Sequence, residues 1–128
     1  MGIQFQYGNV TIIPDLPGGN AVSVDIDSGQ YVVTLNGKSQ SFGLEQIGSI
    51  TYIGNQGGGN VVGIRAPLVC LLYLYGGKNA ITGGHLYNYV YMHGNNNAYG
   101  GSGVWSTVWQ YGGQDNVITW SGGLKVYP

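Results

Sequence analysis

Charged residues are scarce in this chain, and their scarcity excludes several kinds of partner. Only 7% of the 128 residues are charged, and the four basic ones, Lys38, Arg65, Lys78 and Lys125, are scattered along it. They cannot form the basic stripe that a nucleic-acid backbone requires, so no nucleic-acid partner is expected. The longest apolar run, residues 68–75, is far shorter than the roughly 20 residues of a membrane-spanning helix. No membrane span is therefore expected.

Cysteine is nearly absent as well. Cys70 is the only one, so no intrachain disulfide can form, and its apolar neighbours predict a buried thiol that packs as a small hydrophobic side chain. The given chain also lacks an amino-terminal charged-then-apolar signal segment. Low charge together with 43% hydrophobic residues and 25 glycines indicates a folded, β-rich protein. Its length predicts a single domain, residues 1–128.

Asparagine and aromatic residues recur at a nearly constant spacing in the second half. Asparagines that follow glycine-rich turns lie 19, 18 and 19 residues apart, at Asn60, Asn79, Asn97 and Asn116. Aromatic residues just upstream lie 21, 18 and 18 residues apart, at Tyr52, Tyr73, Tyr91 and Trp109. Because a fixed period of this kind is typical of stacked repeats, we expect one asparagine ladder and one aromatic ladder along the stack.

The first half carries separate strand signals. Residues 21–27 alternate apolar and polar side chains, which predicts a strand with one buried face. Asn36-Gly37 lies between two further strand-like segments, 31–35 and 38–42. This dipeptide is typical of a two-residue hairpin turn, since both positions need a positive φ. We expect residues 1–48 to form amino-terminal strands and a hairpin cap, and residues 49–128 to form the repeat coils.

These patterns predict an all-β fold, and most favour a parallel β-solenoid of about six coils of 18–20 residues. In such a stack equivalent residues lie about 4.8 Å apart, so an asparagine amide can bond to the same amide in the next coil. The alternative is a pseudo-threefold β-trefoil or β-prism, in which Asn20, Asn60 and Asn97 would each begin one lobe. Their separations of 40 and 37 residues suit that closure, but the shorter period is more regular.

The glycine-rich turns resemble the RTX-like β-roll and β-solenoid repeats of bacterial secreted and surface proteins. The segments that carry this resemblance end at Asn60, Asn79 and Asn116. In that family an aspartate of the turn binds Ca²⁺, which takes six to eight oxygen ligands. This chain has five acidic residues, and only Asp115 lies in a repeat turn. We therefore expect asparagine to replace most of the calcium-binding aspartates, and we expect folding without a cofactor, calcium included.

Candidate catalytic groups are few. Asp25 and Asp27 lie two residues apart on one strand, but a solvent-facing polar side explains them better than glycoside chemistry does. His85 and His93 have no acidic or cysteine neighbour in sequence that would complete a metal site. No Gly-x-Ser-x-Gly nucleophile motif is present. We expect no enzyme activity, no catalytic residues and no metal site.

Two functional hypotheses remain. The first is a non-catalytic structural protein, extracellular or at the cell surface, that self-assembles as a homo-oligomer, a filament or a surface layer. An open β edge at the end of the last coil favours it, because unpaired strands stack. The alternative is a carbohydrate-binding module whose glycan ligand would contact exposed rings and turn groups, at Tyr87, Tyr89, Trp105 and Asp115.

Overall fold

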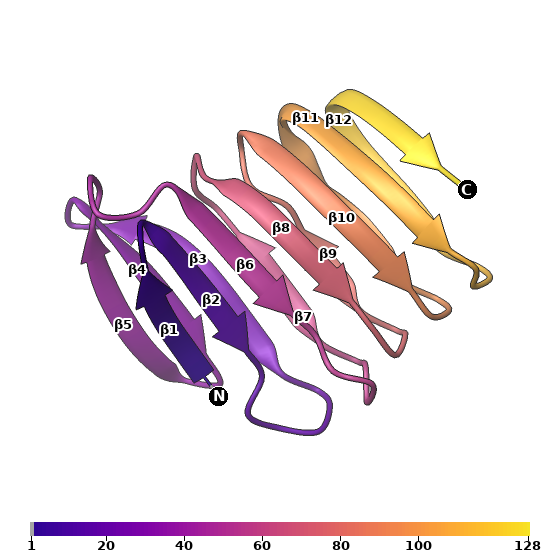
Figure 1. Ribbon diagram of the computed structural model, residues 1–128, viewed down its shortest axis with the longest axis horizontal. Helices are drawn as coiled ribbons and strands as arrows, with labels where there is room; N and C mark the ends of the chain where they lie inside the picture. The colour runs from indigo at the N-terminus through magenta and orange to yellow at the C-terminus, as the bar shows by residue number, and fades with distance from the viewer. Residues whose placement is uncertain (1) are drawn as a thin grey trace.

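The computed structural model describes residues 2–128, and all regular elements in this range are β-strands. In chain order they are β1 (Gly2–Gln6), β2 (Asn9–Ile13), β3 (Ala21–Asp27), β4 (Gln30–Leu35), β5 (Lys38–Gly43), β6 (Ser49–Ile53), β7 (Val61–Ile64), β8 (Val69–Leu74), β9 (Ala80–Thr82), β10 (Tyr87–His93), β11 (Ala98–Tyr111) and β12 (Val117–Tyr127). The strands wind into a stack, and the two chain ends lie at opposite ends of it (Figure 1).

The stack has two faces. On the front face in Figure 1 the parallel neighbours are β2, β6, β8, β10 and the second halves of β11 and β12. On the back face they are β3, β7, β9 and the first halves of β11 and β12. Parallel pairing between successive repeats is the signature of a solenoid, so the predicted β-solenoid is confirmed. It also rules out the trefoil or prism alternative, whose lobes are not built from parallel coils.

The solenoid makes about four turns, fewer than the six expected. The difference arises near Gln40, because β4 and β5 pair antiparallel as a hairpin on the back face and add no coil. β1 likewise pairs antiparallel with β2 on the front face. The segment 1–48 is thus more than a cap. Its strands β2 and β3 pair in parallel with β6 and β7, and the hairpin is inserted after them.

The core lies between the two faces and is built from columns of inward-pointing side chains. One front column contains Ile12, Tyr52, Leu72, Val90 and Val108, each at most 1% exposed. The period-two alternation of each strand places these residues inside and their neighbours outside. Because equivalent positions in successive coils lie next to each other, the 18-residue repeat in the sequence becomes a continuous apolar column.

Tight turns close each coil. The residue before every ladder asparagine of the coils has a left-handed backbone, and these residues are Gly19, Gly59, Lys78, Asn96 and Asp115, with φ between 56° and 67°. The asparagines that follow have no such strain. Stacked turns also approach closely, since a Cβ added to Gly94 would lie 1.8 Å from the carbonyl oxygen of Gly76. Glycine therefore permits the coil spacing at that point.

Candidate interaction surfaces

A line of asparagine side chains runs along one corner of the solenoid and is the most regular polar feature. The side-chain amide of Asn60 donates to Oδ1 of Asn79 at 3.0 Å, and that of Asn79 donates to Oδ1 of Asn97 at 2.9 Å. The backbone N–H of each donor residue bonds to the same oxygen, at 3.0 and 3.1 Å. Every Oδ1 thus accepts two hydrogen bonds from the preceding coil, which satisfies groups that would be costly to bury unpaired.

The ladder extends further than the sequence spacing predicted. Asn36 donates to Oδ1 of Asn20 at 2.8 Å, and Asn20 donates to Oδ1 of Asn60 at 2.9 Å. At the other end the backbone N–H of Asn97 donates to Oδ1 of Asn116 at 2.8 Å. The hydrogen bonds between the predicted ladder residues Asn60, Asn79, Asn97 and Asn116 are confirmed. The inserted hairpin hid the two additional members, because it separates Asn20 from Asn60 by 40 residues.

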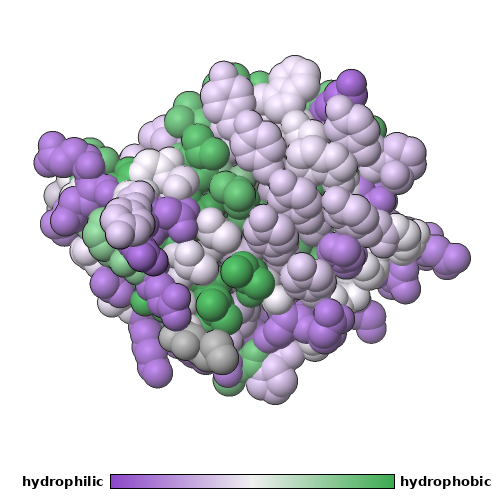
Figure 2. Space-filling model, in the orientation of Figure 1, coloured by the Kyte–Doolittle hydropathy of each residue, from purple (hydrophilic) through white to green (hydrophobic). Residues whose placement is uncertain are grey.

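Aromatic rings form two stacked rows on the front face. In the first row Tyr91 stacks on Tyr73 at 4.7 Å and on Trp109 at 4.9 Å, with ring planes within 8° of parallel. Tyr127 adds a fourth ring, 5.8 Å from Trp109. In the second row His93 stacks between two tyrosines, Tyr75 and Tyr111. Figure 2 shows the pale side chains of this face gathered over the carboxyl-terminal half of the stack.

Tyr52 does not belong to this aromatic ladder, which corrects the predicted set. Its strand partner is Leu72, and Ile53 is the residue that pairs with Tyr73. Tyr52 points into the core, where it is 1% exposed and burial raises the pKa of its hydroxyl to about 12. The spacing of 21 residues was one too long, because an odd displacement moves a side chain to the other face of a strand.

The predicted sugar-contacting residues do not converge. Tyr87 and Trp105 are strand partners on the front face, 45% and 39% exposed, and Tyr89 lies two residues along the same strand as Tyr87. Asp115 lies beyond Tyr111, in the turn at the opposite end of these strands. Its φ of 59° places it at the left-handed turn position that Lys78 occupies in another coil. Asp115 therefore has a conformational role in its turn.

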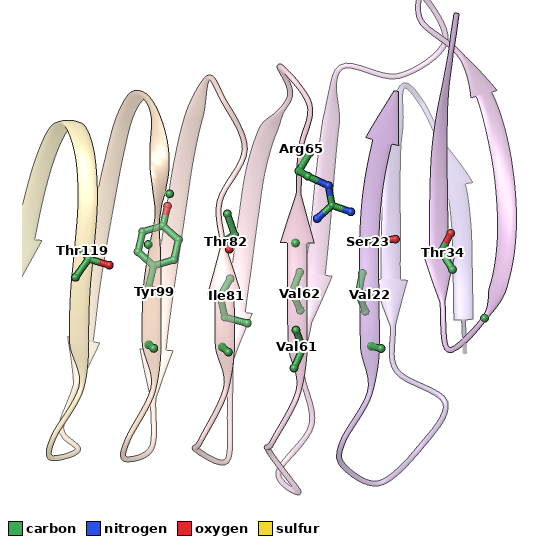
Figure 3. A pocket seen from close by; sticks show the side chains of 17 residues that line it. Val22, Ser23, Thr34, Val61, Val62, Arg65, Ile81, Thr82, Tyr99 and Thr119 are labelled. Carbon is green, nitrogen blue, oxygen red and sulfur yellow. The ribbon is translucent and has the colours of Figure 1, made fainter. Parts of the chain in front are cut away.

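The back face is hollowed into a shallow trough of about 640 Å³ (Figure 3). Its floor consists of small side chains and glycines from successive strands, among them Ala21, Ala80, Ala98, Gly63 and Gly100. Arg65 extends toward β3 and pairs with Asp25, with 2.9 Å between Nη2 and Oδ2. Asp25 is thus engaged in a surface ion pair. The trough offers little charge or depth with which to grip a small ligand.

Cys70 is fully buried in the core, as predicted, and is a free thiol. Burial raises the pKa of this thiol to about 12, so the reactive thiolate is scarce at neutral pH. Nearby, the hydroxyl of Tyr99 lies 2.7 Å from Oγ of Ser106 inside the coil, and burial raises the pKa of Tyr99 as well. These groups hold the interior together and are closed to solvent.

The carboxyl-terminal end of the stack leaves core positions uncovered. β12 has β11 as its one strand partner among residues 2–128, so its other edge is open over eleven residues. The inward-facing Leu124 and Val126 are 38% and 37% exposed, whereas Val108 in the preceding coil is fully buried. This edge and these side chains form the "open end" of the solenoid.

Comparison with protein-family models, with characterised proteins and with solved structures finds no match to this chain. Within residues 2–128 no three histidine, cysteine, aspartate or glutamate side chains come together as a metal site would require. In the same range no helix is long and apolar enough to cross a membrane. The functional argument therefore rests on the chain's own surfaces, of which the open end and the aromatic rows are the most distinctive.

Proposed function

We propose that this protein is a non-catalytic structural protein that self-associates through the open end of its solenoid, in an extracellular or cell-surface setting. The observation that carries the proposal is that three kinds of repeat interaction all stop at β12. They are the backbone ladder, the aromatic row that ends at Tyr127 and the apolar column that ends at Val126. Each would continue if another strand were added to the edge.

The energetics of the open end favour such an addition. An unpaired strand edge presents N–H and C=O groups that bind a further strand, and natural proteins usually block it with charge, proline or a bulge. Here the edge carries one charged residue, Lys125, whose side chain lies over the ring of Tyr127 at 5.1 Å. The net charge of −1 on 128 residues adds little long-range repulsion between copies.

The asparagine ladder supports the calcium-independent part of the proposal. Each buried ladder oxygen already accepts two hydrogen bonds from protein N–H groups. Such an oxygen faces N–H donors, which is the wrong environment for a cation. The RTX-like repeats that the turns resemble would need carboxylates there. We therefore propose that the solenoid is permanently folded and that metal binding does not switch its assembly.

Sugar binding is less well supported than self-association. Rings that bind sugars need a free flat face, but Tyr91 and Trp109 have a stacked ring on both faces. The pair most favourable to a glycan is Tyr87 and Trp105, which are exposed neighbours on the front face. A heat of binding to a soluble glycan, in a protein that stays monomeric, would favour this alternative over self-association.

Sedimentation analysis across a range of concentrations tests the proposal. We expect the native protein to form species larger than a monomer, and we expect Val126→Lys at the open end to be monomeric. The matched control is Val61→Lys, the same change at a 57% exposed position of β7 in the middle of the stack, which should associate like the native protein. Circular dichroism would check that both variants keep their β structure. A native protein that stays monomeric at the highest concentration would refute the proposal.

A further inference from the structure

The two ends of the solenoid differ in how they treat an incoming strand. On the amino-terminal end, Lys38 of β5 pairs with Leu35, whose side chain is inward and 2% exposed. Lys38 therefore points inward as well, and it lines a depression at this end with Ile3 and Leu35. An inward-pointing charge on an edge strand is a device that opposes edge-to-edge pairing, because the added strand would bury it.

The open end has no such device. Its inward positions are Ile118, Trp120, Leu124 and Val126, and all four are apolar. Ile118 and Trp120 pack against the core, while Leu124 and Val126 are more than one-third exposed. A partner strand at this end would cover apolar surface and leave no charge inside. The structure thus offers one adhesive end and one blocked end.

We propose that two copies join tail to tail through their β12 strands and so form a closed, two-fold symmetric dimer. This inference rests on the proposed self-association and specifies its partner and geometry. An adhesive end that meets its own copy makes an isologous contact, which uses up both adhesive surfaces. Growth then stops at two copies, because the outer ends of the dimer both carry the inward Lys38.

The fold of β12 defines the pairing. The strand turns a corner at Gly122, with φ of 131°, so Thr119 on the back face and Lys125 on the front face are equally far from the corner. A two-fold axis along the strand direction exchanges the two faces. It brings the first half of one β12 antiparallel to the second half of the partner's. Thr119 then lies opposite the partner's Lys125, and Ile118 lies opposite the partner's Val126.

The other two-fold arrangement is less favourable. An axis perpendicular to the faces would pair the second half of β12 with itself, across a centre near Lys125. Two lysines directly opposite each other on neighbouring strands are destabilising. The arrangement that exchanges the faces avoids this contact, because each lysine meets a threonine. Charge therefore decides between the two symmetric ways of joining the same edges.

Cysteine cross-linking tests the geometry. The double variant Thr119→Cys/Lys125→Cys should form an intermolecular disulfide under mild oxidation and double its mass on a non-reducing gel. The two new thiols of one chain lie on opposite faces, roughly 10 Å apart, which is too far for a disulfide within the chain. Cys70 does not compete, because it is fully buried. The single variant Lys125→Cys should remain uncross-linked.

The controls separate this inference from the proposed function. In a head-to-tail filament β12 would meet β1, and Lys125 would lie in the column of Gln4, so Gln4→Cys/Lys125→Cys would give a ladder of higher multiples. That ladder would support self-association but overturn the closed dimer. A covalent dimer of the single Lys125→Cys variant would overturn the face-exchanging arrangement. A monomer in sedimentation and in every cross-linking variant would overturn both proposals.

Discussion

At the scale of single residues, the ladder asparagines explain why an amide and no other group is repeated. Asn79 is 2% exposed, and its Oδ1 accepts two hydrogen bonds from Asn60. Its Nδ2 donates to Oδ1 of Asn97 and also to the carbonyl of Tyr75, at 3.0 Å. Only a side chain with both an acceptor and two donors can satisfy neighbours on both sides. Aspartate has the shape but lacks the donors.

Replacing Asn79 should therefore be costly. Asn79→Ala is expected to lower the free energy of unfolding by about 3 kcal/mol, because it leaves buried groups of two coils unpaired. Asn79→Asp should destabilise at neutral pH and recover as the pH falls, since the protonated acid is uncharged and regains a donor. The control Asn95→Ala removes one exposed hydrogen bond, to Gln114, and should cost less than about 1 kcal/mol. Urea denaturation would measure these losses, and equal losses for the two alanine variants would contradict the ladder's role.

At the scale of elements, the turns decide the coil geometry. The left-handed position before each ladder asparagine of the coils is occupied by glycine in two coils, and by Lys78, Asn96 or Asp115 in the others. A side chain with a branched or bulky Cβ is disfavoured in this conformation, whereas glycine adopts it freely. The position thus explains both the glycine-rich pattern upstream of the asparagines and the single aspartate among them.

A matched pair of lysine substitutions tests this view of the turn. Lys78→Gly is expected to raise the free energy of unfolding by about 1 kcal/mol, because it relieves the left-handed strain at φ of 56°. Lys38→Gly removes the same side chain from the regular strand β5 and should lower stability by about 0.5–1 kcal/mol, since glycine weakens a strand. Thermal and urea unfolding of both variants would measure the opposite signs. A loss of stability in Lys78→Gly would mean that the side chain matters more than the turn.

At the scale of the whole molecule, the solenoid is held together by uncharged interactions repeated from coil to coil. Apolar columns fill its interior, amide ladders bind one corner, and stacked rings cover the front face. The one ion pair found in residues 2–128, between Arg65 and Asp25, is exposed and contributes little. Stability should therefore depend weakly on salt and on metal ions.

Removal of calcium should leave the molecule unchanged. We expect the melting temperature to be the same in a chelator and in millimolar calcium, because the turns use asparagine amides where metal-dependent repeats use carboxylates. Differential scanning calorimetry would measure it. A calcium-dependent rise of several degrees would show that Asp115 and neighbouring carbonyls hold an ion after all. The variant Asp115→Asn, which keeps a residue that tolerates the left-handed turn, would then abolish that rise.

The sequence by itself determined the repeat and most of the strands. The 18-residue period, the alternation in 21–27 and the Asn36-Gly37 turn are local patterns, and each matches the structure. The row Tyr75, His93 and Tyr111 carries the same period and could have been found from its spacing. Such features are readable because their cause lies within one or two strands, where side-chain periodicity and turn conformation are set.

Only the tertiary structure decided what depends on pairing between distant segments. It moved Tyr52 into the core and put Ile53 in its place, because parallel register is fixed by neighbouring coils. It inserted a hairpin where a coil was expected, joined Asn20 and Asn36 to the ladder, and separated Asp115 from Tyr87 and Trp105. It also showed which end of the stack is open. Burial and unpaired edges are properties of the assembled coils, so no local pattern could reveal them.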